Sequence, residues 1–381
     1  MELSKRMGWK IPLFKILFDE EDIDSLTNAI KAGTHWADGP CIKEFEKLIA
    51  DYIGTKYCVL FNSGTSALHA ALLAHDIKQG DEVIVPSFTF ISTANAPIFV
   101  GAKPIFADIE EETLGIDSED VKEKITSKTR AIIPVHYGGC PCKIRELKEI
   151  ADDYDLVLIE DAAESFGAKI GDKKVGIFGN SAMFSFCQNK IIATGEGGAV
   201  TTDSKRIYKN LKLIGSHGRD VADYFSSTEY IDYIRLGYNF RMSNITAALG
   251  VSQIKKVNTI IDMRRDNAEY LFKKLSQRDE DIAVLKTPNE YFNVYQMFTI
   301  KVKNYRDDLI KHLLENDITT KVYFFPVHLT HFYRNELRYT CELPITEKVS
   351  KEVLSLPMYP TLSRNEMDYM VEVINKFFEV V

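Results

Sequence analysis

The chain has 381 residues, of which 45% are hydrophobic and 27% are charged, and its formal net charge is −8. This length and composition are typical of a globular protein with one large domain and a smaller second one. The excess of acidic residues argues against a general nucleic-acid-binding surface, and no apolar run is long enough to span a bilayer.

The opening sequence, MELSKRMGWKIPLF, lacks the apolar core and the small-residue cleavage site of a signal peptide. The six cysteines predict no disulfide framework, because the C-P-C spacing of Cys140 and Cys142 fits neither a C-x-x-C redox motif nor paired zinc ligands. The eight histidines include no H-E-x-x-H motif and no clustered ligand set. We therefore expect a cytoplasmic protein with reduced thiols and no bound metal.

Between about residues 55 and 205, short β-rich runs alternate with helical patterns. This alternation predicts an α/β fold with a mostly parallel sheet, and the nearly continuous apolar runs are typical of strands covered on both faces. The strand-like runs are YCVLF, DEVIVP, KPIFADI, RAIIPVHY, LVLIED, AMFSF and GAVTTD, and the helical patterns are SALHAALLA, ISTANAPIFV and KIRELKEIADDYD.

A long helical pattern begins near Ser243 and continues to about residue 277, which predicts one helix that bridges two domains. After about residue 280 the pattern changes to strand, helix, strand and helices. We therefore predict a large domain over residues 1–250 and a smaller α/β domain over residues 251–381. The segments of the smaller domain are MFTIKV, DDLIKHLLEND, TTKVYFF, EKVSKEVLSL and NEMDYMVEVINKFFEV.

Ligands of open α/β sheets bind at the carboxyl ends of the strands, and two segments with polar residues fall there. In FNSGTSALHAA, residues Gly64, Thr65 and Ser66 can offer backbone N–H groups to an anion at a helix N-terminus. An ordinary N-cap and tight turn has the same sequence. In LVLIEDAAES, the strand ends with Glu160 and Asp161, which fit a metal ligand, a general base, the partner of a buried cation or a structural cap.

Lys190 lies in an apolar segment, SAMFSFCQNKIIATGEGGAV, that then breaks into glycines. Because a buried, unpaired charge is costly, a lysine in such a segment is exposed, paired or reactive. Ser185 precedes it by five residues, and the glycines beyond it let the backbone turn close to a ligand. The GEGG sequence is neither a P-loop nor a dinucleotide-binding motif.

Pyridoxal phosphate needs this combination of residues. Its aldehyde needs a lysine for a Schiff base, and desolvation lowers the pKa of such a lysine so that a nucleophilic amine is available. Its ring nitrogen needs a carboxylate partner to stay protonated, and its phosphate needs N–H and hydroxyl donors. Lys190, Asp161, Ser185 and the helix start at Gly64 supply these groups.

Together these motifs resemble the DegT/DnrJ/EryC1/StrS family of pyridoxal-phosphate-dependent sugar aminotransferases of fold type I. The resemblance covers nearly the whole chain and implies a large domain with a mostly parallel central sheet and a smaller C-terminal α/β domain. The motifs that carry it are GPCIKEFEKLIADYIG, NSGTSALHAAL, GDEVIVPSFTFISTANAPIFVGAKPIFADI, VHYGG, IEDAAESFGA, FSFCQNKIIATGEGGAV and LGYNFRMSNITAALG.

The resemblance implies a role for each matching residue. Lys190 is the Schiff-base lysine and later moves a proton, and Asp161 pairs with the pyridinium nitrogen. The phosphate is held by Gly64, Thr65 and Ser185 of the same chain. Phe90 stacks on the cofactor ring, although an aromatic residue is also typical of a core. Asn239 reaches the phosphate bound by the neighbouring subunit, so that a homodimer shares its active sites.

Glu164, the segment around Lys190 and three histidines need separate treatment. Glu164 occupies a position near the phenolic oxygen of the cofactor where many members have Gln or His, and a carboxylate there repels a phenolate unless it is protonated or turned elsewhere. The sequence FCQNK departs from the commoner F-x-P-x-K form but keeps the lysine. Among His136, His217 and His328, we expect mostly structural roles, with His328 the best candidate for a substrate-facing residue.

The resemblance implies transfer of an amino group from L-glutamate to a nucleotide-linked keto-sugar, in amino-sugar or surface-polysaccharide biosynthesis. The DAAES sequence associates the chain with enzymes of 4-keto-sugars, which favours a 4-keto-6-deoxyhexose. A sugar dehydratase is one alternative, but the dehydratases of this family have His at the position of Lys190. A catalytically silent regulatory protein is the other alternative, and it has no need for a reactive amine. We expect neither a nucleic-acid nor a membrane partner.

Overall fold

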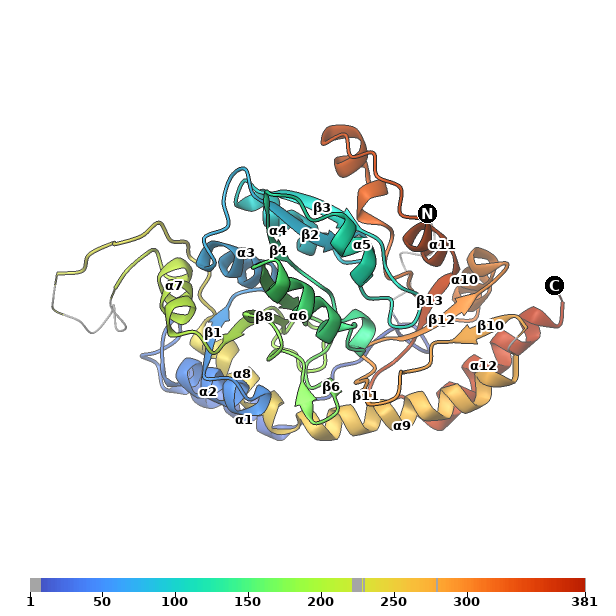
Figure 1. Ribbon diagram of the computed structural model, residues 1–381. Coiled ribbons are helices and arrows are strands. Elements are labelled where there is room, and N and C mark those ends of the chain that lie inside the picture. Colours follow the sequence, from blue (N-terminus) through green and yellow to red (C-terminus); the bar gives the residue numbers. More distant parts are fainter. Residues whose placement is uncertain (1–7, 221–227, 229, 279, 381) are drawn as a thin grey trace.

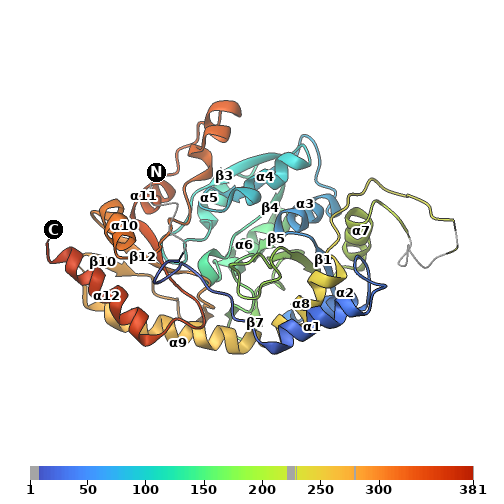
Figure 2. The same cartoon turned by 180° about the vertical axis from the view of Figure 1, so that it is seen from behind.

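The central sheet determines where the ends of the strands meet. The computed structural model describes residues 8–220, 228, 230–278 and 280–380, and within these ranges seven strands form this sheet in the order β1-β9-β8-β5-β4-β2-β3 (Figures 1 and 2). Strand β9 runs antiparallel to β1 and β8, whereas the other neighbouring pairs are parallel. The predicted α/β fold with a mostly parallel sheet is therefore confirmed. These strands are β1 Tyr57–Phe61, β2 Glu82–Pro86, β3 Lys103–Ala107, β4 Thr129–Ile132, β5 Val157–Asp161, β8 Ser181–Ser185 and β9 Gly198–Thr202.

Both faces of the sheet are buried, because successive side chains of each strand point in opposite directions. In β1, Val59 and Phe61 pack into the cluster that contains α3 and α7, whereas Cys58 and Leu60 pack into the cluster that contains α2 and α8. The helices of the described residues are α1 Glu20–Lys31, α2 Pro40–Ile53, α3 Gly64–Ala74, α4 Ile91–Phe99, α5 Ser118–Glu123, α6 Ile144–Asp153, α7 Lys205–Gly215, α8 Asn244–Lys255, α9 Val257–Leu275, α10 Arg306–Glu315, α11 Pro344–Glu352 and α12 Arg364–Phe378.

The single helix predicted from Ser243 onward is wrong, since the structure has two helices, α8 and α9, that meet at Lys256. The backbone of Lys256 leaves the helical region, with φ −103° and ψ 8°. Its Nζ forms ion pairs with Asp19 and with Asp22, at 2.8 Å from Asp22, at the start of α1. No proline or glycine separates the two helices, so the sequence carries no signal for this break. Helix α9 then runs along the lower edge of the molecule toward the C-terminal part (Figure 1).

The C-terminal part contains a second, antiparallel sheet in the order β10-β12-β13, formed by Ile282–Val284, Phe298–Val302 and Val353–Leu356. Two predictions fail here. The segment TTKVYFF is no strand, because only Lys321 makes a bridge, to Ser355, while the chain goes on to line a cavity. The helix predicted for EKVSKEVLSL ends at Glu352, because the next four residues are fully buried and form β13.

A short sheet and the N-terminal segment also connect distant parts of the chain. Strands β6 Lys169–Ile170 and β7 Lys173–Lys174 pair in the order β11-β6-β7 with β11 Tyr291–Phe292. Ile11 forms a bridge with Ile318 and belongs to the apolar cluster of the C-terminal sheet. The domain boundary between residues 250 and 251 stays a prediction. No helix within the described ranges combines the length and the hydrophobicity needed to cross a membrane.

Candidate active site

A cavity of about 500 Å³ lies where the carboxyl ends of β1, β2, β5 and β8 meet. Residues 321–324, which follow α10 in the C-terminal part, form another part of its wall. The structure brings seven of the residues predicted for the site into the lining of this cavity. They are Gly64, Thr65, Phe90, Asp161, Glu164, Ser185 and Lys190.

The N-terminus of α3 forms one end of the cavity. Ser63 caps this helix, and its hydroxyl accepts the N–H of Ser66. The N–H groups of Gly64 and Thr65 belong to the first turn and have no acceptor within the helix. A Cβ atom at position 64 would lie 3.1 Å from Cβ and 3.3 Å from Oγ of Ser185, so glycine allows the helix end to approach that hydroxyl closely. This arrangement of N–H and hydroxyl donors fits a phosphate group.

Asp161 ends β5 and is 4% exposed. Its Oδ2 accepts the hydroxyl of Thr93 at 2.7 Å, and its Oδ1 accepts the N–H of Ala163 at 3.2 Å. The Thr93 hydroxyl also contacts that of Thr89 at 2.8 Å, so a chain of hydroxyl groups orients the carboxylate. Burial raises the pKa of Asp161, and its hydrogen bonds and the charge of Lys190 act in the opposite direction. A cation placed against this carboxylate offsets the cost of its burial.

Lys190 lies beside Glu164, with its Nζ 3.4 Å from Oε1 of the carboxylate. The other oxygen, Oε2, accepts the N–H of Gly138 at 3.0 Å. Glu164 is therefore turned toward the lysine and the backbone, which is one of the two conditions under which a carboxylate is compatible with this position. The lysine is therefore paired in the structure.

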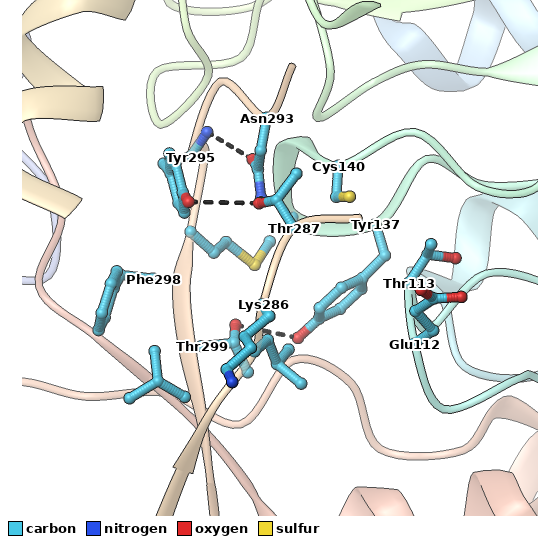
Figure 3. Close-up of a pocket in the computed structure, with 14 residues that line it drawn as sticks. Glu112, Thr113, Tyr137, Cys140, Lys286, Thr287, Asn293, Tyr295, Phe298 and Thr299 are labelled. Atoms are coloured by element: carbon cyan, nitrogen blue, oxygen red, sulfur yellow. Dashed lines mark hydrogen bonds between the residues drawn. The ribbon is translucent and has the colours of Figure 1, made fainter. Parts of the chain in front are cut away.

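The turn that holds Glu164, Tyr137–Gly139, lies between the two parts of the chain. The N–H of Met297 donates to the carbonyl of Gly138, and the Tyr137 hydroxyl donates to the carbonyl of Tyr323 at 2.6 Å. A small pocket lies beside this turn, and Figure 3 shows Tyr137 pointing across it toward Thr299, 3.3 Å away. The hydroxyl thus connects the turn to the wall residue Tyr323 of the main cavity.

Beneath the cavity, Glu160 forms a buried network with four hydrogen bonds. Its carboxylate is fully buried and faces Nε2 of His136 at 3.0 Å. Because Nδ1 of His136 accepts a backbone N–H, Nε2 carries the hydrogen and donates to Glu160. Glu160 is therefore structural, and it fixes the strand end that presents Asp161. The three backbone donors to Glu160 are Gly176, Phe178 and Gly179, at 2.7, 2.8 and 2.8 Å.

Replacement of Glu160 by alanine should strongly destabilise the protein. The substitution leaves three buried N–H groups and one imidazole without their acceptor, and each unsatisfied group costs about 1–3 kcal/mol. We expect the free energy of unfolding to fall by roughly 3 kcal/mol or more, measured by urea titration. The control Glu149→Ala removes an exposed carboxylate of α6 and should change this free energy by less than about 0.5 kcal/mol. Equal effects of the two substitutions would contradict the structural role of Glu160.

The remaining predicted residues lie in different surroundings. Phe90 is 60% exposed at the cavity, so its alternative interpretation as a core residue is wrong. His328 does not line the cavity, because it is buried between the Ser87 hydroxyl, 2.6 Å from Nδ1, and Glu347, 3.4 Å from Nε2. Asn239 is exposed and lies outside the cavity of its own chain.

Several lining residues were absent from the sequence predictions. Ser92 contacts the Thr65 hydroxyl at 2.8 Å, and Thr89 and Thr93 support Asp161. The hydroxyl-rich sequence SFTFIST at the end of β2 could have indicated these three residues, since it follows a buried strand. Lys321 and Tyr323 were missed because residues 319–325 were expected to form an ordinary strand.

The donors in this cavity fit pyridoxal phosphate. An amine, a buried carboxylate and an anion-binding helix N-terminus line one cavity, and their chemistry matches the aldehyde, the ring nitrogen and the phosphate of the cofactor. The exposed ring of Phe90 supplies an apolar surface next to them.

Comparisons with known proteins agree with this site. The model of the DegT/DnrJ/EryC1/StrS aminotransferase family matches residues 17–375. GDP-perosamine synthase of Escherichia coli O157:H7 is 35% identical over 370 residues, which cover 97% of this chain and 98% of that protein. The solved structure of DesV from S. venezuelae is 29% identical, covers 98% of this chain and 100% of its own, and has a TM-score of 0.89. The sugar aminotransferase Spr1654 of Streptococcus pneumoniae, solved in a PLP form, is 25% identical with a TM-score of 0.89, and 98% of each chain is covered.

Proposed function

Because this chain belongs to the DegT/DnrJ/EryC1/StrS aminotransferase family, we propose that it transfers an amino group from L-glutamate to a keto-sugar carried on a nucleoside diphosphate, with pyridoxal phosphate as cofactor. The observation that carries this proposal is the meeting of Lys190, Asp161 and the N-terminus of α3 in one cavity. Few other cofactors need an amine, a buried carboxylate and an anion site in this arrangement.

The residues of the cavity have separate roles in cofactor binding and in proton transfer. When bound, pyridoxal phosphate supplies an aldehyde that exchanges amino groups and a protonated ring that withdraws electrons. Gly64, Thr65 and Ser185 would hold the phosphate, and Asp161 would hold the protonated ring nitrogen. Lys190 would provide the amine and move a proton, and the carboxylate of Glu164 lies beside its amino group.

The name of a relative and one sequence motif guide the proposed identity of the sugar. The E. coli relative is named a GDP-perosamine synthase, so GDP is the first nucleotide to test. We propose amination at C4 of a 4-keto-6-deoxyhexose, from the association of the DAAES sequence with 4-keto-sugar enzymes. We place the enzyme in the cytoplasm, and this is supported by the six cysteines, all of which are free thiols.

A spectroscopic experiment separates this function from its alternatives. Purified protein with added pyridoxal phosphate should gain a visible absorbance, and L-glutamate should remove it while an equal amount of 2-oxoglutarate forms. Subsequent addition of a GDP-linked 4-keto-6-deoxyhexose should restore the absorbance and yield the amino sugar. A sugar dehydratase would release water from the sugar without retaining the amino group in the product. A silent regulatory protein would show no change with either substrate.

We further propose a homodimer in which Asn239 acts in the active site of the partner. Beyond α7, the described residues before position 221 and after position 227 lead away from the body of the molecule (Figure 1). This segment exposes large apolar side chains, which is typical of an interface. The exposed residues of the segment are Tyr230, Tyr233, Ile234 and Leu236.

Mixed dimers should test the placement of Asn239. Chains with Lys190→Ala are combined with chains that carry Asn239→Asp, which adds a carboxylate against the phosphate. If Asn239 serves the partner, one site of the mixed dimer carries both lesions and the other carries none, so activity should return to about a quarter of the wild-type value for random mixing. If Asn239 serves its own chain, every site keeps one lesion and no activity returns. A fully active monomer in sedimentation would also contradict the shared site.

A further inference from the structure

The wall of the cavity formed by residues 321–324 contributes a charged group that the proposed mechanism does not use. Lys321 lines the cavity and has an exposed side chain. Its backbone is fixed to β13 by two hydrogen bonds. The N–H of Lys321 donates to the carbonyl of Ser355 at 3.2 Å, and the carbonyl of Lys321 accepts the N–H of Ser355 at 2.9 Å. The side chain therefore starts from a defined point of the C-terminal sheet and not from a mobile loop.

The ammonium group of Lys321 is not neutralised within the described part of the chain. Its Nζ lies 5.1 Å from the ring centroid of Tyr323, another residue of the cavity wall, and forms no ion pair with any described carboxylate. Other lysines of the C-terminal part differ in this respect. Lys301 and Lys348 both pair with Glu111, at 3.0 and 3.1 Å.

The charges that line the cavity indicate a binding role for the Lys321 ammonium group. The described lining contains three carboxylates, Asp161, Glu164 and Glu196, and two lysines, of which Lys190 is committed to Glu164 and to the amine chemistry. Both proposed substrates are anions, since L-glutamate carries two carboxylates and a nucleotide sugar carries a diphosphate. An anion that enters a cavity with an excess of carboxylates needs a cation to bind.

We propose that Lys321 binds an oxyanion of a substrate and so holds that substrate against the part of the cavity wall formed by residues 321–324. This inference rests on the proposed function for the identity of the anion, which is a carboxylate of the amino donor or the diphosphate of the sugar nucleotide. Lys321 is a substrate-binding residue and takes no part in proton transfer. Its substitution should therefore change the concentration dependence of one half-reaction more than its maximal rate.

The test uses the enzyme loaded with pyridoxal phosphate and compares Lys321→Met with wild type in two arms. The first arm measures the loss of visible absorbance as a function of L-glutamate concentration. The second arm measures the Kd of GDP by calorimetry. We expect an increase of about 10-fold or more in the half-saturating concentration of one of the two ligands, which is the usual effect of losing a charge-assisted hydrogen bond. The arm that responds identifies the anion.

Matched variants keep the result interpretable. Lys321→Arg retains the charge and should keep the affected constant within a few-fold of wild type. Lys321→Gln also removes the charge, so it should show the same increase as expected for Lys321→Met and replaces that variant in the test if Lys321→Met folds poorly. Lys351→Met removes an exposed lysine of α11 and should change neither constant. Unchanged constants in both arms would overturn the proposal. If wild type does not react with L-glutamate but GDP binding depends on Lys321, the proposed donor fails and the role of Lys321 stands.

Discussion

Replacement of Lys190 by alanine should abolish amino transfer. The substitution removes the nucleophilic amine together with the group that moves the proton, and general acid–base catalysis alone contributes about 10² to 10⁴-fold. We expect kcat to fall by roughly 10⁴-fold or more, while the cofactor still binds through its phosphate and ring without the covalent link. The measurement is the rate of 2-oxoglutarate formation from L-glutamate, together with the visible spectrum.

The experiment needs a control for the pairing of Lys190 with Glu164, since alanine leaves that buried carboxylate without its cation. Lys190→Arg keeps a positive charge beside Glu164 but lacks the reactive amine, so it should be equally inactive while its melting temperature stays near that of wild type. Lys148→Ala, which removes a partly exposed lysine of α6, should leave activity unchanged. In wild type, borohydride reduction followed by peptide mapping should place the cofactor on Lys190. A label on another lysine would show that the assignment is wrong.

The parts of the fold that the sequence predicted well are those in which local pattern and burial agree. The strands of the central sheet are apolar on both faces, and the helix that begins at Gly64 has a capping box in its own sequence, with Ser63 and Ser66 as its two members. Both signals are local, so they could be recognised without knowledge of the rest of the chain.

The errors arose where distant contacts determine the structure. The break at Lys256 depends on two carboxylates at the start of α1, more than 200 residues earlier in the chain. The strand Val353–Leu356 forms because it pairs with β12, whereas the helical pattern before it continues smoothly through Glu352. No property of residues 319–325 taken alone distinguishes a strand from the wall of a cavity.

In the candidate site, too, the sequence revealed some residues, whereas contacts between distant residues became visible only in the structure. The resemblance named Lys190, Asp161 and the residues that we propose to bind the phosphate, and the structure brings them together in one cavity. The resemblance did not reveal the Thr89 and Thr93 hydroxyls that orient Asp161. These hydroxyls and Asp161 lie about 70 positions apart in the chain, so their arrangement becomes visible only in the folded structure. The resemblance also left the role of Glu164 open, and the hydrogen bond from Gly138 could be found only in three dimensions.

Replacement of Asp161 by asparagine should separate cofactor binding from catalysis. Asparagine is nearly isosteric with aspartate and can keep the contacts to Thr93 and the N–H of Ala163, so the geometry of the cavity should persist. A neutral amide, however, does not stabilise a protonated ring nitrogen, and the ring then withdraws electrons poorly. We expect the rate of amino transfer to fall by roughly 10³-fold, equivalent to about 4 kcal/mol of transition-state stabilisation.

The Asp161→Asn substitution should not destabilise the cofactor-free protein. Burial raises the pKa of Asp161 in the folded protein above its ordinary value, so the ionised form disfavours folding at neutral pH, and that cost is lost when the charge is removed. The melting temperature of the cofactor-free variant should therefore be equal to or higher than that of wild type at pH 7. A large drop in this temperature would assign Asp161 a structural role. Asp152→Asn, at an exposed position of α6, serves as the control for both activity and stability.

A cofactor analogue makes the test specific for the charge on the ring nitrogen. Pyridoxal phosphate methylated at this nitrogen carries a permanent positive charge that needs no carboxylate partner to persist. We expect the analogue to recover part of the lost rate in the Asp161→Asn variant, measured in the half-reaction with L-glutamate. In wild type the analogue should give no gain, because the Asp161 carboxylate already keeps the ring charged and the added methyl group crowds it. A variant within about 10-fold of the wild-type rate with the natural cofactor would show that Asp161 does not serve the ring nitrogen.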